Sequence, residues 1–188
     1  MLTTQRSFQT LGLSLPRSAR ADITASLFCS LLIAISAQIA VRIPLSPVPI
    51  TAQTFTILLL AYTLGRKRAV MSVVLYLAEG TAGLPVFAGG GAGAAWLLGP
   101  TGGYLLGFVL AALVVGYLGE LDRSHAIKAL IAFTAGHLVI YLAGAGWLSF
   151  YTGLEAALQT GVLPFLIGDA MKIVVGAVSV PQVRRYLV

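Results

Sequence analysis

Charged residues are scarce in this sequence: Asp, Glu, Lys and Arg make up 10% of its 188 residues, whereas 58% are hydrophobic. An ordinary soluble domain carries about 25% charged residues, so this composition excludes that class. The length accommodates about six membrane spans of roughly 20 residues with short connections. We therefore expect an all-α integral membrane protein, a bundle of six transmembrane helices in which residues 1–188 form a single domain.

Motifs of nucleotide, metal and disulfide chemistry are also missing. The sequence has no G-x-x-x-x-G-K-[ST] phosphate loop, no H-E-x-x-H and only one cysteine, Cys29. We expect neither an enzyme nor a protein with a metal or cofactor, and any nucleotide hydrolysis must come from another protein. The net charge is +6, but the basic residues are scattered between apolar runs. This distribution is typical of a protein in a lipid bilayer rather than one that binds nucleic acid.

Six apolar segments follow one another, separated by charged or proline-rich turns. The expected spans comprise residues 22–41, 50–64, 69–79, 103–118, 129–142 and 162–180, of which the second and third are short. Asp22 is placed to cap the first helix, and three prolines make residues 42–49 a stiff external loop. Residues 143–160, which carry Trp147 and Tyr151, are expected to form a short helix or loop at the outer interface.

The basic residues also predict the orientation. A cytoplasmic N-terminus places Arg6, Arg17, Arg20, Arg66, Lys67, Arg68, Arg123, Lys128, Arg184 and Arg185 on the cytoplasmic side. Arg42 alone falls outside, and Lys172 falls within a span. Because cytoplasmic loops carry an excess of Lys and Arg, we expect a multi-pass protein of the plasma membrane with both termini cytoplasmic.

A glycine-rich stretch, residues 83–104, interrupts the helical pattern between the third and fourth spans. Glycine allows the backbone to approach a ligand closely, and Pro100 stiffens the turn before the next helix. Large aromatic side chains in the same stretch need a surface to pack against. We expect an external binding loop, and its candidate substrate contacts are Phe87, Gly89, Gly90, Gly91, Trp96 and Tyr104.

Asp169 and Lys172 lie three residues apart within the last span, and therefore on one face of a helix. Each charge would cost roughly 2.5–3.5 kcal/mol in lipid, so both must point into the bundle. The two residues either form a structural ion pair or provide a polar surface that can hydrogen-bond to an amide or urea group of a ligand. Gln53 is a further candidate contact, and His137 is either a helix–helix hydrogen-bonding group or a cavity residue.

Small residues recur every fourth position in the first span, at Ser26, Ser30 and Ala34. Such a stripe allows another helix to approach closely in lipid. The stripe serves either packing inside the bundle or docking to another membrane protein, and the three residues are candidate partner-docking positions.

Four segments together resemble one family. Residues 83–93 (GLPVFAGGGAG), 97–108 (LLGPTGGYLLGF), 47–53 (PVPITAQ) and 168–172 (GDAMK) are similar to the BioY family, the biotin-specific substrate-binding subunits (S components) of energy-coupling factor (ECF) transporters. One departure is Gly91, where some relatives carry an asparagine.

The resemblance implies a six-helix bundle that binds biotin from outside and assembles with a transmembrane coupling (T) subunit and two ATPase subunits. Asp169 and Lys172 would then bind the urea of biotin, and Phe87, Trp96 and Tyr104 would cover its rings. The sequence leaves open whether the chain forms a homo-oligomer. An alternative is a stand-alone channel or facilitator for a small neutral solute, and a structural assembly protein is a third.

Overall fold

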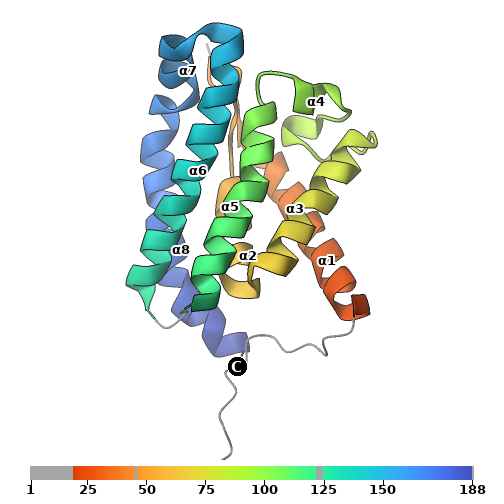
Figure 1. The fold of residues 1–188 in the computed structure, drawn as a ribbon, viewed down its shortest axis with the longest axis vertical. Coiled ribbons are helices and arrows are strands. Elements are labelled where there is room, and N and C mark those ends of the chain that lie inside the picture. Colours follow the sequence, from red (N-terminus) through yellow and green to blue (C-terminus); the bar gives the residue numbers. More distant parts are fainter. Residues whose placement is uncertain (1–18, 45, 122–124, 188) are drawn as a thin grey trace, which may run out of the picture.

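The computed structural model describes residues 19–44, 46–121 and 125–187, and it is almost entirely helical (Figure 1). The longer helices are α1 (Ala19–Gln38), α2 (Gln53–Leu64), α3 (Arg66–Thr81), α5 (Gly102–Leu121), α6 (Ala126–Thr152) and α8 (Leu166–Leu187). The shorter elements are β1 (Ala40–Val41), β2 (Ile50–Thr51), η1 (Ala88–Gly90), α4 (Ala95–Leu98), α7 (Leu154–Gly161) and η2 (Leu163–Phe165). The two strands pair antiparallel and form a short ribbon between α1 and α2.

Four helical segments are long and apolar enough to cross a membrane. They are Ala21–Gln38, Gly102–Leu121, Ala126–Thr152 and Leu154–Val180. Helix α2 is apolar but has 12 residues, which is about 18 Å at 1.5 Å per residue. Helix α3 has 16 residues and begins with three basic ones. The fold is therefore that of an all-α membrane protein, with two of the expected spans shorter than the hydrocarbon core.

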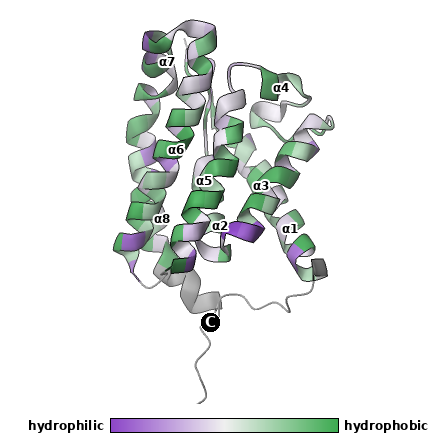
Figure 2. Ribbon diagram, in the orientation of Figure 1, coloured by the Kyte–Doolittle hydropathy of each residue, from purple (hydrophilic) through white to green (hydrophobic). Residues whose placement is uncertain are grey.

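Hydrophobic residues predominate along α5, α6 and α8, as the colouring of Figure 2 shows, and many of their large side chains are exposed on the outside of the bundle. Phe150 is 87% exposed and Ile167 is 79% exposed, which would be costly in water and is favourable in lipid. Hydrophilic residues gather instead at the end where α2 meets α3. The outer surface thus supports the membrane assignment made from composition.

Ion pairs join the start of α3 to α1 and to α5 at this same end of the bundle. Lys67 Nζ and Arg68 Nε each lie 2.9 Å from a carboxylate oxygen of Asp22. Arg66 pairs with Glu120 at 3.2 Å, which joins the start of α3 to the end of α5. Helix α1 begins at Ala19, so the prediction that Asp22 caps this helix is wrong. Its carboxylate instead ties α1 to α3.

Most of the other basic residues predicted to be cytoplasmic lie outside the part of the chain whose side chains are described. Arg6, Arg17 and Arg123 lie outside the described residues. The side chains of Arg20, Arg184 and Arg185 are not described either. The charge asymmetry is visible in the structure chiefly through the start of α3.

Helix α6 continues to Thr152, so the prediction of a helix end near residue 142 is wrong. Gly144 of this segment and Gly103 of α5 allow the two helices to pack closely. A Cβ added at Gly103 of α5 would lie 2.1 Å from the Trp147 Cβ and 2.5 Å from the Ala143 carbonyl oxygen. Trp147 donates to the Gly99 carbonyl at 2.9 Å and so ties α6 to the segment that leads into α5.

The stripe of small residues on α1 faces α3. Ser26 and Ser30 are fully buried, and Ala34 is 8% exposed. Ser26 donates to the Arg68 carbonyl at 3.4 Å, and Ser30 donates to the Glu79 carboxylate at 2.8 Å. The structure therefore favours packing inside the bundle, and the assignment of these residues to a partner-docking surface is corrected accordingly, because α3 already covers them.

Candidate functional site

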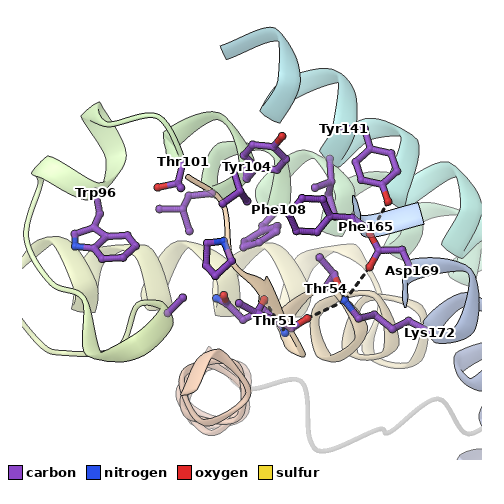
Figure 3. Close-up of a pocket in the computed structure, with 16 residues that line it drawn as sticks. Thr51, Thr54, Trp96, Thr101, Tyr104, Phe108, Tyr141, Phe165, Asp169 and Lys172 are labelled. Atoms are coloured by element: carbon purple, nitrogen blue, oxygen red, sulfur yellow. Dashed lines mark hydrogen bonds and ion pairs between the residues drawn. The ribbon is translucent and has the colours of Figure 1, made fainter. Parts of the chain in front are cut away.

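A pocket lies between α2, α5, α6 and α8, under the segment that contains α4 (Figure 3). It holds about 600 Å³ of space, part of which is open to solvent. Its lining residues are Val48, Pro49, Thr51, Gln53, Thr54, Ala88, Trp96, Thr101, Tyr104, Leu105, Phe108, Ile140, Tyr141, Phe165, Asp169 and Lys172. Thr54, Asp169 and Lys172 gather at one end and Trp96 lies at the other, with the rings of Tyr104, Phe108 and Phe165 between them. This polarity is typical of a site for a small molecule with one polar and one apolar part.

The polar end is built on the first turns of α8. Lys172 Nζ lies 2.8 Å from Asp169 Oδ1, 2.8 Å from the Thr51 carbonyl oxygen and 3.0 Å from Thr54 Oγ1. Tyr141 of α6 donates to the other carboxylate oxygen of Asp169 at 2.6 Å. Asp169 is only 5% exposed, so this ion pair is shielded from solvent. The two predicted charges thus point inward, into the pocket.

The same groups retain capacity for a ligand. A carboxylate offers about four lone-pair positions, and Lys172 and Tyr141 occupy one on each oxygen of Asp169. Thr54 accepts a hydrogen bond from Lys172, which leaves its own hydroxyl hydrogen available for donation. The polar end can therefore accept from N–H groups and donate to a carbonyl at the same time.

His137 lies behind Asp169 and does not line the pocket. Its Nδ1 is 2.9 Å from the Phe133 carbonyl oxygen of its own helix, so this nitrogen carries the hydrogen. Its Nε2 is 3.7 Å from Asp169 Oδ1 and has no hydrogen-bond partner among the described residues. Of the two predicted alternatives, the structure favours the position between helices, since His137 does not line the pocket and its Nε2 faces Asp169 of α8 at 3.7 Å, beyond hydrogen-bond distance.

Aromatic residues form the apolar end of the pocket. Tyr104 packs its ring against Gly144 of α6, where an added Cβ would lie 2.3 Å from ring carbons. Its hydroxyl donates to the Gly161 carbonyl at 2.7 Å, which links α5 to α7. These contacts fix the Tyr104 ring in the wall, opposite Trp96 (Figure 3). Both residues, predicted from the sequence as substrate contacts, thus line the pocket.

Phe87 does not line the pocket, contrary to the prediction from sequence. It is fully buried behind Trp96, with ring centroids 6.0 Å apart, and meets Tyr76 edge to face at 5.5 Å. Gly80 makes room for it, because a Cβ there would lie 2.2 Å from the Phe87 ring. Phe87 therefore supports the wall that Trp96 forms.

The glycine run shapes this wall without lining the pocket itself. Gly90 donates its N–H to Gln38 Oε1 at 3.0 Å, which ties the run to α1. A Cβ at Gly91 would lie 2.2 Å from Trp96 Cζ2, so the indole occupies the space that a larger residue would fill. Gly89 borders an adjacent cavity. None of the three glycines lines the pocket itself, so the structure gives the run a role in shaping this wall, and its direct contact with the substrate stays a prediction.

Gln53 lines the pocket as predicted, at 3% exposure, and donates to the Tyr76 hydroxyl at 2.6 Å. Three further lining residues, Tyr141, Phe108 and Phe165, were not singled out in the sequence. The two phenylalanines are indistinguishable from other core residues of apolar helices. Tyr141 follows His137 by one helical turn, a spacing that places both side chains on one face of α6. This spacing was the available signal for Tyr141.

An all-helical membrane protein with an amphipathic pocket is the class that this fold and site define. The chain belongs to the BioY family, whose model matches residues 8–188.

Relatives and a solved structure agree with this assignment. A protein of Thermotoga maritima named biotin transporter BioY is 42% identical over 164 residues, which cover 87% of this chain and 95% of that protein. A probable biotin transporter BioY of Pyrococcus horikoshii is 41% identical over 141 residues, 75% of this chain and 82% of the relative. The crystal structure of an S-component for biotin from an ECF-type ABC transporter matches with a TM-score of 0.77 at 29% identity, covering 88% of this chain and 92% of that one.

Proposed function

We propose that this protein is the biotin-binding S component of an ECF-type ABC transporter and captures biotin for uptake. The observation that carries the proposal is the pocket, in which the cluster around Asp169 and Lys172 faces a wall of aromatic rings. Biotin has the matching chemistry, because its fused rings are apolar around a urea with N–H donors and a carbonyl acceptor. The relatives are named as transporters, so the chain is not assigned an enzymatic reaction.

The contacts follow from the hydrogen-bonding capacity at the polar end. Asp169 accepts from the urea N–H groups through its remaining lone pairs. The Thr54 hydroxyl, oriented by Lys172, donates to the urea carbonyl. Trp96 and Tyr104 cover the rings from the opposite end. Hydrogen bonds to charged groups contribute roughly 1.5–3 kcal/mol each, which suits a high-affinity site.

The proposed topology has six spans, with α2 and α3 completing the four longer ones. The cluster of Arg66, Lys67 and Arg68 then marks the cytoplasmic side, together with both termini. The elements α4 and α7 lie at the opposite end of the bundle, so the pocket faces outward (Figure 1).

The proposed partners are a transmembrane T subunit and two ATPase subunits, which would supply the energy for release of biotin inward. The absence of a phosphate-loop motif from the sequence supports this division of labour. A channel or facilitator would require polar groups distributed along the bundle, whereas the polar groups of the pocket are concentrated around Asp169.

Radiolabelled biotin binding to the purified chain in detergent, without nucleotide, tests the proposal. We expect saturable binding in the submicromolar range. Desthiobiotin, which keeps the urea, should compete, and lipoate, which lacks it, should not. Absence of saturable binding by folded, monodisperse protein would refute the assignment. Uptake into proteoliposomes by the chain alone, linear in biotin concentration, would favour the facilitator.

A further inference from the structure

A second cavity adjoins the pocket at its apolar end. Pro49, Ala88 and Trp96 line both, so the two cavities share a wall. The remaining residues of the second cavity are Ala40, Arg42, Ile43, Ser46, Pro47 and Gly89. Arg42 is the single charged residue among them. The pocket therefore runs from a charge-balanced polar end toward a region that contains one guanidinium.

The charge of Arg42 is not balanced within the described part of the chain. No hydrogen bond or ion pair joins Arg42 to another described residue. Asp169 is the single acidic residue that lines either cavity, and it is already paired with Lys172. Gly89 leaves room for the guanidinium, since an added Cβ would lie 3.3 Å from Arg42 Nη2. An anionic ligand group can therefore meet Arg42 without displacing a protein carboxylate.

The backbone around Arg42 is held in place before any ligand arrives. Arg42 directly follows β1, in which Val41 pairs with Ile50 and Ala40 pairs with Thr51. The carbonyl of Thr51 accepts from Lys172, so this short ribbon connects the polar end of the pocket to the segment that carries Arg42.

Ser46 anchors the segment that follows. Its hydroxyl donates to the Thr160 carbonyl at 2.7 Å, at the end of α7, and accepts from the Val48 N–H at 3.2 Å. Three prolines in residues 42–49 stiffen the same segment. Holding the segment in advance reduces the ordering cost of binding.

We propose that Arg42 binds the carboxylate of the ligand and sets the specificity for an anionic side chain. The inference rests on the proposed function, because biotin carries a valerate carboxylate at the end of the molecule opposite its urea. With the urea at Asp169, the valerate extends past Trp96 toward the second cavity. A guanidinium matches a carboxylate with two parallel N–H···O bonds, which a lysine ammonium cannot reproduce.

The test measures binding of biotin and of its uncharged methyl ester by wild type, Arg42→Gln, Arg42→Lys and a control, Arg66→Gln. Arg66 lies at the far end of the bundle in an exposed ion pair, so its substitution changes net charge equally without touching the cavity. We expect Arg42→Gln to weaken biotin binding about tenfold or more, because a charge-assisted hydrogen bond is lost. The ester should bind Arg42→Gln and wild type equally, Arg42→Lys should fall between them for biotin, and Arg66→Gln should match wild type for both ligands.

Salt gives a second readout. Biotin affinity of wild type should fall as ionic strength rises, and that dependence should be weaker in Arg42→Gln, since exposed charges are screened.

The outcomes separate the two proposals. Unchanged biotin affinity in Arg42→Gln would overturn the role of Arg42, as would an equal loss for biotin and ester. Discrimination between acid and ester that survives in Arg42→Gln and disappears in Lys172→Met would place the carboxylate at the opposite end of the pocket. Failure of wild type to bind either ligand would instead refute the proposed function, and this inference with it.

Discussion

Substitution of both partners of the Asp169–Lys172 pair should separate structural stability from ligand recognition. The variants are Asp169→Asn, Lys172→Met and the double variant, each close in volume to the residue it replaces. In Asp169→Asn the ammonium keeps the Thr51 and Thr54 oxygens at 2.8 and 3.0 Å but has no countercharge. In Lys172→Met the carboxylate keeps only the Tyr141 hydroxyl at 2.6 Å.

The expected stabilities follow from burial. The Asp169 side chain is 8% exposed and that of Lys172 is 19% exposed, so either charge left alone is poorly solvated. Breaking such a buried pair costs about 3–5 kcal/mol, whereas replacing both partners with uncharged residues is often close to neutral. We expect the free energy of unfolding to fall by about 3 kcal/mol in each single variant, and the double variant to recover most of this loss.

Biotin binding, unlike stability, should not recover in the double variant. Each single variant should lose about tenfold or more in biotin affinity, and the double variant should remain as weak, because recognition needs the groups themselves. Unfolding curves in mixed detergent and SDS give the stabilities, and radiolabelled biotin gives the affinities. Recovery of binding together with stability in the double variant would refute the recognition role and leave a purely structural ion pair.

Three further predictions concern the packing around the pocket. Gly91→Asn should weaken biotin binding and shift the tryptophan fluorescence, because its Cβ would overlap the indole of α4, at 2.2 Å from Cζ2; an unchanged spectrum would contradict this. Gly103→Val should lower the unfolding temperature strongly by separating α5 from α6, while Gly146→Ala, with nothing within 4 Å of its added Cβ, serves as the tolerated control. Ala34→Trp should destabilise the isolated chain because this position is buried inside the bundle, whereas Ile35→Trp, at a 65% exposed position, should not; equal stability of the two variants would return the stripe to a docking surface.

The helical membrane class and most helix positions follow from composition and local pattern. Low charge and long apolar runs leave few alternatives in a bilayer, where backbone polar groups must be satisfied within the chain. The prediction that the fifth span ends near residue 142 is wrong because it rested on the aromatic residues that follow, whereas α6 continues to Thr152 and Trp147 bonds to the segment that leads into α5.

The charged half of the site was also readable in the sequence. A carboxylate and an ammonium three residues apart in a membrane helix must face inward, because either charge would be costly in lipid. This conclusion depends only on the residues of that one helix. The glycine and aromatic content of residues 83–104 likewise predicted a binding loop, and Trp96 and Tyr104 of this stretch line the pocket.

The sequence by itself determined that this protein lies in the membrane, that Asp169 and Lys172 share an inward face, and that residues 83–104 are not an ordinary helix. The tertiary structure alone decided which apolar residues line the pocket, since Phe87 and Phe108 look alike in sequence and one lies behind the wall while the other lines it. It also decided that Ser26 and Ser30 face α3, and that Arg42 stands next to the pocket without a protein partner among the described residues. The physical reason is the separation along the chain over which each effect acts. The cost of a charge in lipid acts on each residue separately, whereas burial and cavity shape depend on segments that are distant in the sequence.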